Sequence, residues 1–146
     1  MKKSRKDTAL LLPDTNVFVA AIKDPRRETE TIRLIMAMID REDIRLVGDD
    51  FLVEEMVRYA EEFQSETASW ILGALLGKME IMEVNEKFVR ICRDYIDTPN
   101  LSDIVHAAAC LKSDAVLVTN DTHYDRIRDE GIIEVWSISM AIKTLL

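Results

Sequence analysis

The sequence predicts an α/β protein in which helices cover both faces of a central parallel sheet. Short apolar runs typical of buried strands alternate along the chain with stretches typical of helices. These strands are continuously apolar, as expected for parallel strands that are buried on both faces. Two of the clearest strands also end at an acidic residue, Asp14 and Asp121. Because ligands bind beyond the carboxyl ends of such strands, one edge of the sheet is the expected functional site.

Five strands are expected from these apolar runs. The first run ends at Pro13, which cannot donate to a strand ladder, and Asp14 follows at once. The run AVLVT is a clear buried strand that leads to Asn120 and Asp121. The predicted strands are 9–12, 44–48, 79–84, 115–119 and 132–136.

Helices are expected between these strands. In the second helix, apolar residues recur at spacings of three and four, which is the mark of an amphipathic helix. The helix that starts at Ser102 is apolar almost all round and should be deeply buried. Asp14 or Thr15, Asp49–Asp50, and Ser65 or Glu66 are candidate N-caps. The predicted helices are 15–22, 28–41, 51–63, 66–78, 87–95, 102–112 and 137–146.

The length of 146 residues suits one domain over 1–146, with 1–7 as a flexible basic terminus. For Lys2 to Lys6 the alternative is an RNA-gripping arm, but a frayed terminus is the default. The longest apolar run, Trp70 to Gly77, is far shorter than the ~20 residues of a membrane helix, so no membrane association is expected. Cys92 and Cys110 match neither a metal motif nor a disulfide framework, which favours buried thiols and a cytoplasmic location.

The net charge of −8 argues against a protein that coats nucleic acid through cationic contacts. It does not argue against a metal-dependent nuclease, because bound divalent cations reverse the charge where the phosphate must lie. Further acids can therefore belong to a site. On the helix 51–63, Glu55 falls at the flank of the buried stripe, whereas Glu54 falls on the solvent face. Asp103 lies in the first turn of the buried helix, where the helix dipole favours a carboxylate.

These residues resemble the PIN-domain family of metal-dependent ribonucleases. The similar stretches are LLPDTNVFVAAI, FLVEEMVRYA, LSDIVHAAACLKSDAVLVTND, and the tail from THYDRI to EVWSISMAI, and they cover nearly the whole chain in the family's order. The unit SDxxHAAAC followed by a strand and TND is the most specific of them. The family commonly has a further Asp two residues after TND, where this chain has His123, with Asp125 two residues beyond.

The resemblance implies a three-layer α/β/α sandwich whose acids gather at one end of the sheet and hold Mg²⁺ or Mn²⁺. It also implies hydrolysis of RNA phosphodiester bonds by in-line attack, without a covalent enzyme intermediate. Oxygen ligands suit Mg²⁺, which can polarise the phosphate and activate a water. The implied catalytic and metal-binding residues are Asp14, Glu55, Asp103 and Asp121, with Glu55 able to act through a water.

Neighbouring polar and basic residues are candidates for supporting roles. Five polar side chains are expected to hydrogen-bond the carboxylates or a phosphate oxygen: Thr15, Asn16, Ser102, Thr119 and Asn120. Four basic side chains are expected to grip the RNA backbone: Lys23, Arg26, Arg27 and Arg58.

Two histidines and one helix have competing interpretations. His106 follows Asp103 by three residues, but a buried histidine bonded to the backbone is favoured over a metal ligand or a base. For His123, an exposed turn residue is favoured over a ligand. The stretch Trp70 to Leu76 suits a helix facing the core and a homodimer face about equally well.

The favoured function is an endoribonuclease acting on single-stranded or structured RNA. It would be either the toxin of a VapC-like toxin–antitoxin pair, with an antitoxin protein as partner, or a stand-alone RNA-processing enzyme. The alternative is a non-catalytic PIN-fold module that binds RNA or protein, although such a module has no need of four mutually repelling carboxylates. A phosphate-accepting receiver domain would need an acidic pair after the first strand and a lysine after the last, and the sequence has neither.

Overall fold

A computed structural model describes residues 8–23, 30–98 and 100–146. The predicted terminus 1–7 and the start of the predicted helix 28–41 lie outside these ranges. The described residues form a five-stranded sheet in which all pairings are parallel, in the order β3-β2-β1-β4-β5. This confirms the predicted parallel sheet. The strands are β1 (Ala9–Pro13), β2 (Ile44–Gly48), β3 (Met79–Ile81), β4 (Val116–Val118) and β5 (Val135–Trp136).

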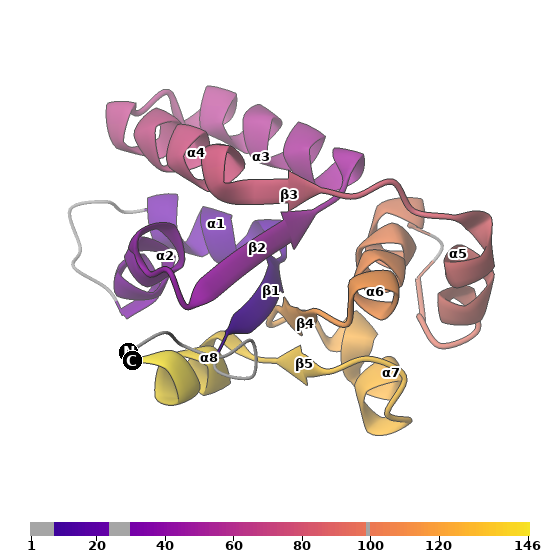
Figure 1. The fold of residues 1–146 in the computed structure, drawn as a ribbon. Coiled ribbons are helices and arrows are strands. Elements are labelled where there is room, and N and C mark those ends of the chain that lie inside the picture. The colour runs from indigo at the N-terminus through magenta and orange to yellow at the C-terminus, as the bar shows by residue number, and fades with distance from the viewer. Residues whose placement is uncertain (1–7, 24–29, 99) are drawn as a thin grey trace.

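Helices cover both faces of this sheet, as the predicted three-layer sandwich requires (Figure 1). On one side α1 packs against α2, which also contacts α8, and on the other side α5 packs against α6. The helix α3 contacts both α1 and α6. The helices are α1 (Thr15–Ile22), α2 (Glu30–Asp40), α3 (Asp50–Phe63), α4 (Glu66–Lys78), α5 (Glu86–Arg93), α6 (Leu101–Ser113), α7 (Asp125–Asp129) and α8 (Ile138–Leu145), with a 3₁₀ turn η2 (Thr122–Tyr124) before α7.

The interior is built from the strands predicted to be buried and from one face of each long helix. Leu11 and Leu12 of β1 are completely buried at the centre of the sheet. The helix α6 lies close to the sheet because its buried residues Ala107, Ala108 and Ala109 are small. Both cysteines are buried thiols, as predicted. Among the helices of the described ranges, none has the length and apolar composition that a bilayer crossing would need.

The two interpretations of Trp70 to Leu76 are partly resolved by α4. Ile71 and Leu75 are buried in the core, so the helix does face the interior. Trp70 lies outside that stripe and is 56% exposed. A homodimer through this face stays a prediction.

Some elements differ from their predicted bounds. The strands β3 and β5 are shorter than the apolar runs that contain them, because each lies at an edge of the sheet and pairs on one side only. The chain after Asp121 turns through η2 into α7, and this helix was not predicted.

The strand order reverses direction between β1 and β4. Successive connections lead from β1 to β2 and β3 on one side, and then return through β4 to β5 on the other. Ligands of open α/β sheets bind at such a reversal, at the carboxyl ends of the strands. Asp14 directly follows β1 and Asp121 follows β4 by three residues, so the fold places two of the predicted acids at this position.

Candidate metal centre

Asp14 is buried at the junction of β1 and α1, where its carboxylate is held by two donors. The backbone N–H of Thr15 donates to Oδ1 at 2.7 Å, and the Thr119 hydroxyl donates to Oδ2 at 2.8 Å. Burial raises the pKa of Asp14, and the charge of His106 and these hydrogen bonds offset only part of that effect. The carboxylate is therefore fixed in direction but poorly compensated in charge.

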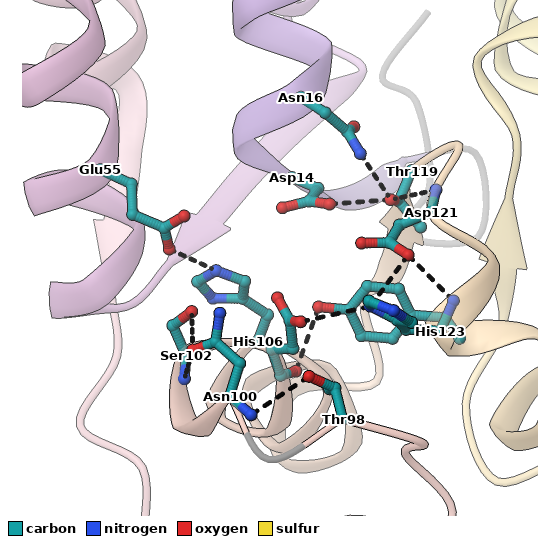
Figure 2. Close-up of polar contacts among 12 residues, drawn as sticks. Asp14, Asn16, Glu55, Thr98, Asn100, Ser102, His106, Thr119, Asp121 and His123 are labelled. Carbon is teal, nitrogen blue, oxygen red and sulfur yellow. Dashed lines mark hydrogen bonds and ion pairs between the residues drawn. The ribbon is translucent and has the colours of Figure 1, made fainter.

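Thr119 ties Asp14 to Asp121. Its hydroxyl donates to Asp14 and accepts the backbone N–H of Asp121 at 3.0 Å, and Asn16 Nδ2 lies 3.3 Å from the same oxygen (Figure 2). Thr119 and Asn16 thus lie beside the acids as expected. Thr119, which directly follows β4, therefore links Asp14 at the end of β1 to Asp121 after β4.

Asp103 and Asp121 lie together on a more open part of the site. One ligand atom from each, together with one ring nitrogen of His123, lies within 4.8 Å of the others. Burial raises the pKa of Asp103, and the charge of Asp121 raises it further. A cation placed between the two carboxylates would relieve this repulsion.

The register of α3 agrees with the wheel argument about its two glutamates. The Glu55 side chain is 24% exposed and lines the same pocket as Asp14, Asp103 and Asp121, whereas Glu54 is exposed. Partial burial alone would raise the pKa of Glu55, but hydrogen bonding to His106 and the charge of that ring outweigh it and hold the pKa below its usual value.

Four carboxylates from four separate parts of the chain therefore line one pocket, together with Thr15 and Asn16. Within the described ranges, the buried atoms Thr15 Oγ1 and Asn16 Oδ1 have no hydrogen-bond partner. Buried polar atoms are normally paired, so these two oxygens indicate an unfilled demand for a ligand. A pocket lined by carboxylate, hydroxyl and amide oxygens fits a hard divalent cation such as Mg²⁺ or Mn²⁺.

His106 is buried as predicted, but its expected backbone partner is wrong. Its Nδ1 lies 2.7 Å from Asp49 Oδ2, and its Nε2 lies 3.0 Å from Glu55 Oε1. Figure 2 shows Glu55 pointing from α3 toward the ring of His106 on α6. The histidine bridges two acids because α3 and α6 pack together beside the carboxyl end of β2.

His123 is an exposed residue of the η2 turn, as predicted, and its ring also contacts two acids of the pocket. Its ring is 46% exposed, but Nδ1 lies 3.1 Å from Asp121 Oδ1 and 3.6 Å from Asp103 Oδ2. Its backbone N–H donates to Asp121 Oδ1 at 2.9 Å, which starts the η2 turn. The turn places this ring against both acids, at the position where the family commonly has another Asp.

Two of the polar candidates form hydrogen bonds elsewhere. The hydroxyl of Ser102 donates to Asn100 Oδ1 at 3.0 Å at the start of α6. Asn120 Oδ1 accepts the backbone N–H of Ile138 at 2.9 Å and so fastens the start of α8. Both residues stabilise helix starts near the site, and neither forms a hydrogen bond to a carboxylate of the pocket.

Two of the four basic candidates, Arg58 and Lys23, lie within the described residues. Arg58 is exposed on α3, one turn after Glu55, and its charge helps to lower the pKa of Glu55. Lys23 is exposed at the end of α1. Arg26 and Arg27 lie outside the described residues.

Asp49 contacts His106 beside the pocket, although the sequence predicted it only as a helix cap. It does cap α3, because Oδ1 accepts the Leu52 N–H at 3.0 Å, but its other oxygen contacts His106. The sequence signal for it was present, since Asp49 directly follows the strand β2 just as Asp14 directly follows β1.

Residues 11–130 match the family model of the PIN domain. The chain belongs to the PIN-domain family. This match covers most of the chain and includes all four acids of the pocket. Among curated proteins, none matches this PIN domain.

Solved structures share the fold of this PIN domain at low sequence identity. VapBC2 from Rickettsia felis, bound to a DNA fragment from its promoter, aligns with a TM-score of 0.60 and 16% identity over 88% of this chain and 98% of that chain. VapBC-1 from nontypeable Haemophilus influenzae aligns with a TM-score of 0.59 and 20% identity over 89% and 98%. FitAcB from Neisseria gonorrhoeae gives 0.59 and 18% over 88% and 98%. These similarities show that the PIN fold extends across most of this chain.

Proposed function

We propose that this PIN domain hydrolyses RNA phosphodiester bonds with Mg²⁺ or Mn²⁺ held by Asp14, Glu55, Asp103 and Asp121. The observation that carries the proposal is the convergence of these four side chains on one pocket. Two unpaired buried oxygens in the same pocket add support. Four carboxylates held close together repel one another, so a bound cation would relieve a cost that the metal-free pocket carries.

The acids of the pocket differ in how firmly the protein holds them, and we assign their roles from this difference. Asp14 presents a carboxylate that Thr119 and the α1 backbone fix in place. Asp103 and Asp121 supply the more open side, through which a phosphate can enter. A divalent cation bound here would supply positive charge to polarise the phosphodiester and to stabilise the leaving oxygen.

Arg58 is the described basic residue best placed to attract the RNA backbone near the pocket. It is exposed, and it lines a shallow pocket together with Glu55 and Ser102. A guanidinium can hold phosphate oxygens through several N–H donors. With a net charge of −8, the protein depends on such local cations and on the bound metal to retain a polyanion.

We further propose that the chain is the toxin of a toxin–antitoxin pair. The support is that VapBC2, VapBC-1 and FitAcB are among the structures that share this fold. An acidic pocket is also a suitable receptor for an arginine-bearing tail of a small partner protein. Purification of the chain from its native cell should recover such a partner, whereas isolation of the chain alone would favour a stand-alone RNA-processing enzyme.

Cleavage of a fluorescent single-stranded RNA tests the nuclease proposal. Cleavage should require Mn²⁺ or Mg²⁺, stop with EDTA, and be lost in Asp14→Asn and Asp121→Asn, which keep side-chain size but remove a charged ligand. Glu54→Gln, on the exposed face of α3, is the matched control. Unchanged cleavage by either Asn variant would reveal a contaminating nuclease, and RNA binding without cleavage would favour a non-catalytic module.

A further inference from the structure

The ring of His106 is completely buried between two carboxylates, one at the N-cap of α3 and one on that helix. Asp49 follows β2 directly, and Glu55 lies on α3. The two contacts are short, at 2.7 Å from Nδ1 to Asp49 Oδ2 and 3.0 Å from Nε2 to Glu55 Oε1. Of the two acids, Asp49 is as buried as the ring, whereas Glu55 reaches the pocket.

The chemistry of these contacts fixes the charge of the ring. Ionised carboxylates only accept hydrogen bonds, and a neutral imidazole has a single N–H donor. Both contacts can be hydrogen bonds only when both ring nitrogens carry a proton. Burial alone would lower the pKa of His106, but the bonds to Asp49 and Glu55 raise it to about 10. His106 is therefore a buried cation beside the acidic pocket.

Asp49 holds the ring rigidly from behind. Its second oxygen, Oδ1, accepts the N–H of Leu52, so the carboxylate is fixed to the first turn of α3. Its side chain is only 2% exposed. The orientation of the imidazolium is thus set by the backbone at the end of β2.

Glu55 is the flexible member of the group. It is longer than an aspartate and lies at the flank of α3, where a free glutamate would sample several rotamers. The bond to His106 uses Oε1 and limits that freedom. Asp14 needs no such support, because it is already held by Thr119 and by the start of α1.

We propose that His106, anchored by Asp49, is a positioning residue that holds the Glu55 carboxylate at the metal pocket. The proposal rests on the proposed metal centre. It differs from a purely structural ion pair, because it requires that the effect of His106 on metal binding pass through Glu55.

The test is a set of Mn²⁺ affinities measured by isothermal titration calorimetry. Asp49→Asn keeps an oxygen for the Leu52 N–H and offers an amide to Nδ1, so a neutral His106 still donates from Nε2 to Glu55. Asp49→Asn with His106→Phe removes the donor to Glu55 without leaving a buried unpaired charge. Asp50→Asn, at the exposed neighbouring position, is the matched control.

We expect the double variant to bind Mn²⁺ about 10-fold or more weakly, as for loss of groups that orient metal ligands. Asp49→Asn alone should stay within about threefold of the natural protein, which is the rescue that the retained Nε2 donor predicts. Adding Glu55→Gln to the double variant should cost little more, because coupled residues are not additive. Unchanged affinity in the double variant, or a full additional loss from Glu55→Gln, would overturn the proposal.

Nuclear magnetic resonance of the natural protein gives a second readout that does not depend on the folding of any variant. The Nε2 proton of His106 should be protected from exchange, and its resonance should shift when Mg²⁺ is added. A resonance insensitive to Mg²⁺ would contradict the proposal. If the protein binds Mn²⁺ but cleaves no RNA, the nuclease proposal fails alone, whereas absence of Mn²⁺ binding overturns both.

Discussion

The two halves of the acidic pocket are held in different ways. Asp14 and Glu55 each accept a hydrogen bond from a side chain that is itself buried, Thr119 and His106 respectively. Asp103 and Asp121 face one another on the open side, and the ring they share is the half-exposed His123. The first half is arranged by the protein before any ligand arrives, and the second half depends on a ligand for its compensation.

The two halves of the pocket lower the stability of the fold in different ways. Orienting Asp14 and Glu55 requires buried polar partners, which are costly unless every hydrogen bond is made. Leaving Asp103 and Asp121 less constrained keeps an entrance for a phosphate but retains their mutual repulsion. We therefore expect changes on the first half to alter geometry and changes on the second half to alter charge.

The largest expected effect comes from the arranged half. Glu55→Gln should lower RNA cleavage by about 100-fold or more, since loss of ~3 kcal/mol of transition-state stabilisation has that effect. Glu54→Gln should stay within a few-fold, because that side chain is exposed and does not line the pocket of the four acids. Single-turnover rates at saturating Mn²⁺ measure both variants. Equal losses would mean that α3 does not present Glu55 alone of the two glutamates to the pocket.

The pH dependence of the free energy of unfolding tests whether the buried His106 ring is charged or contributes only through packing. The pKa of His106 is about 10 in the folded protein against 6.5 for the free side chain, so the folded state binds more protons between these pH values. The stabilisation is fully present below pH ~6.5 and is lost as the pH rises toward 10. From pH 7 to 9.5 in EDTA, urea unfolding should show a loss of about 1–3 kcal/mol from this group. The loss should shrink in Asp49→Asn, and an identical loss in that variant would contradict the assignment.

Mn²⁺ affinity allows a direct comparison of the two halves, with a smaller expected effect. Thr119→Val keeps the side-chain shape but removes the donor to Asp14, and should weaken Mn²⁺ binding about 10-fold. His123→Ala on the open half should change it by about threefold or less, because that ring is half-exposed and hydrated. Calorimetric titration of both variants under one set of conditions decides the order. A larger effect of His123→Ala would make it a ligand rather than a neighbour.

Most of the fold could be predicted from the sequence, because the patterns that indicate strands and helices involve residues close together in the chain. The strand at 44–48 and the helix at 15–22 were predicted with their observed bounds, since the apolar run and the caps that define them are adjacent in the chain. The positions of Asp14 and Asp121 followed from the strands they terminate. The edge strands were overestimated because an apolar run does not reveal whether a strand pairs on one side or two.

The supporting network was not predictable in the same way. His106 and Asp49 are 57 residues apart, and nothing in either local pattern indicates that they touch. The apolar face of α6 indicated burial of His106 correctly, but its partner depended on how α3 and α6 pack. The exposed turn position of His123 was predicted, but its contact with Asp121 was not, because that contact arises from the η2 turn.

The central claim is that the acids are gathered to bind a cation and not to support the fold. Two unit charges ~5 Å apart repel by about 3 kcal/mol at an effective dielectric near 20, and less where water enters, so the metal-free site should carry a penalty of ~1–3 kcal/mol. Asp121→Asn keeps the oxygen that accepts the His123 N–H, and Asp103→Asn keeps the side-chain size, so both changes mainly remove charge.

Thermal unfolding of the natural protein, Asp103→Asn and Asp121→Asn, in EDTA and in excess Mn²⁺, tests this claim most directly. In EDTA both variants should melt higher than the natural protein, because one repelling charge is gone. Mn²⁺ should raise the melting temperature of the natural protein and raise that of the variants much less, since a ligand that binds only the folded state stabilises it. If both variants melt lower in EDTA and Mn²⁺ shifts none of the three proteins, the acids are scaffolding and the metal centre is refuted.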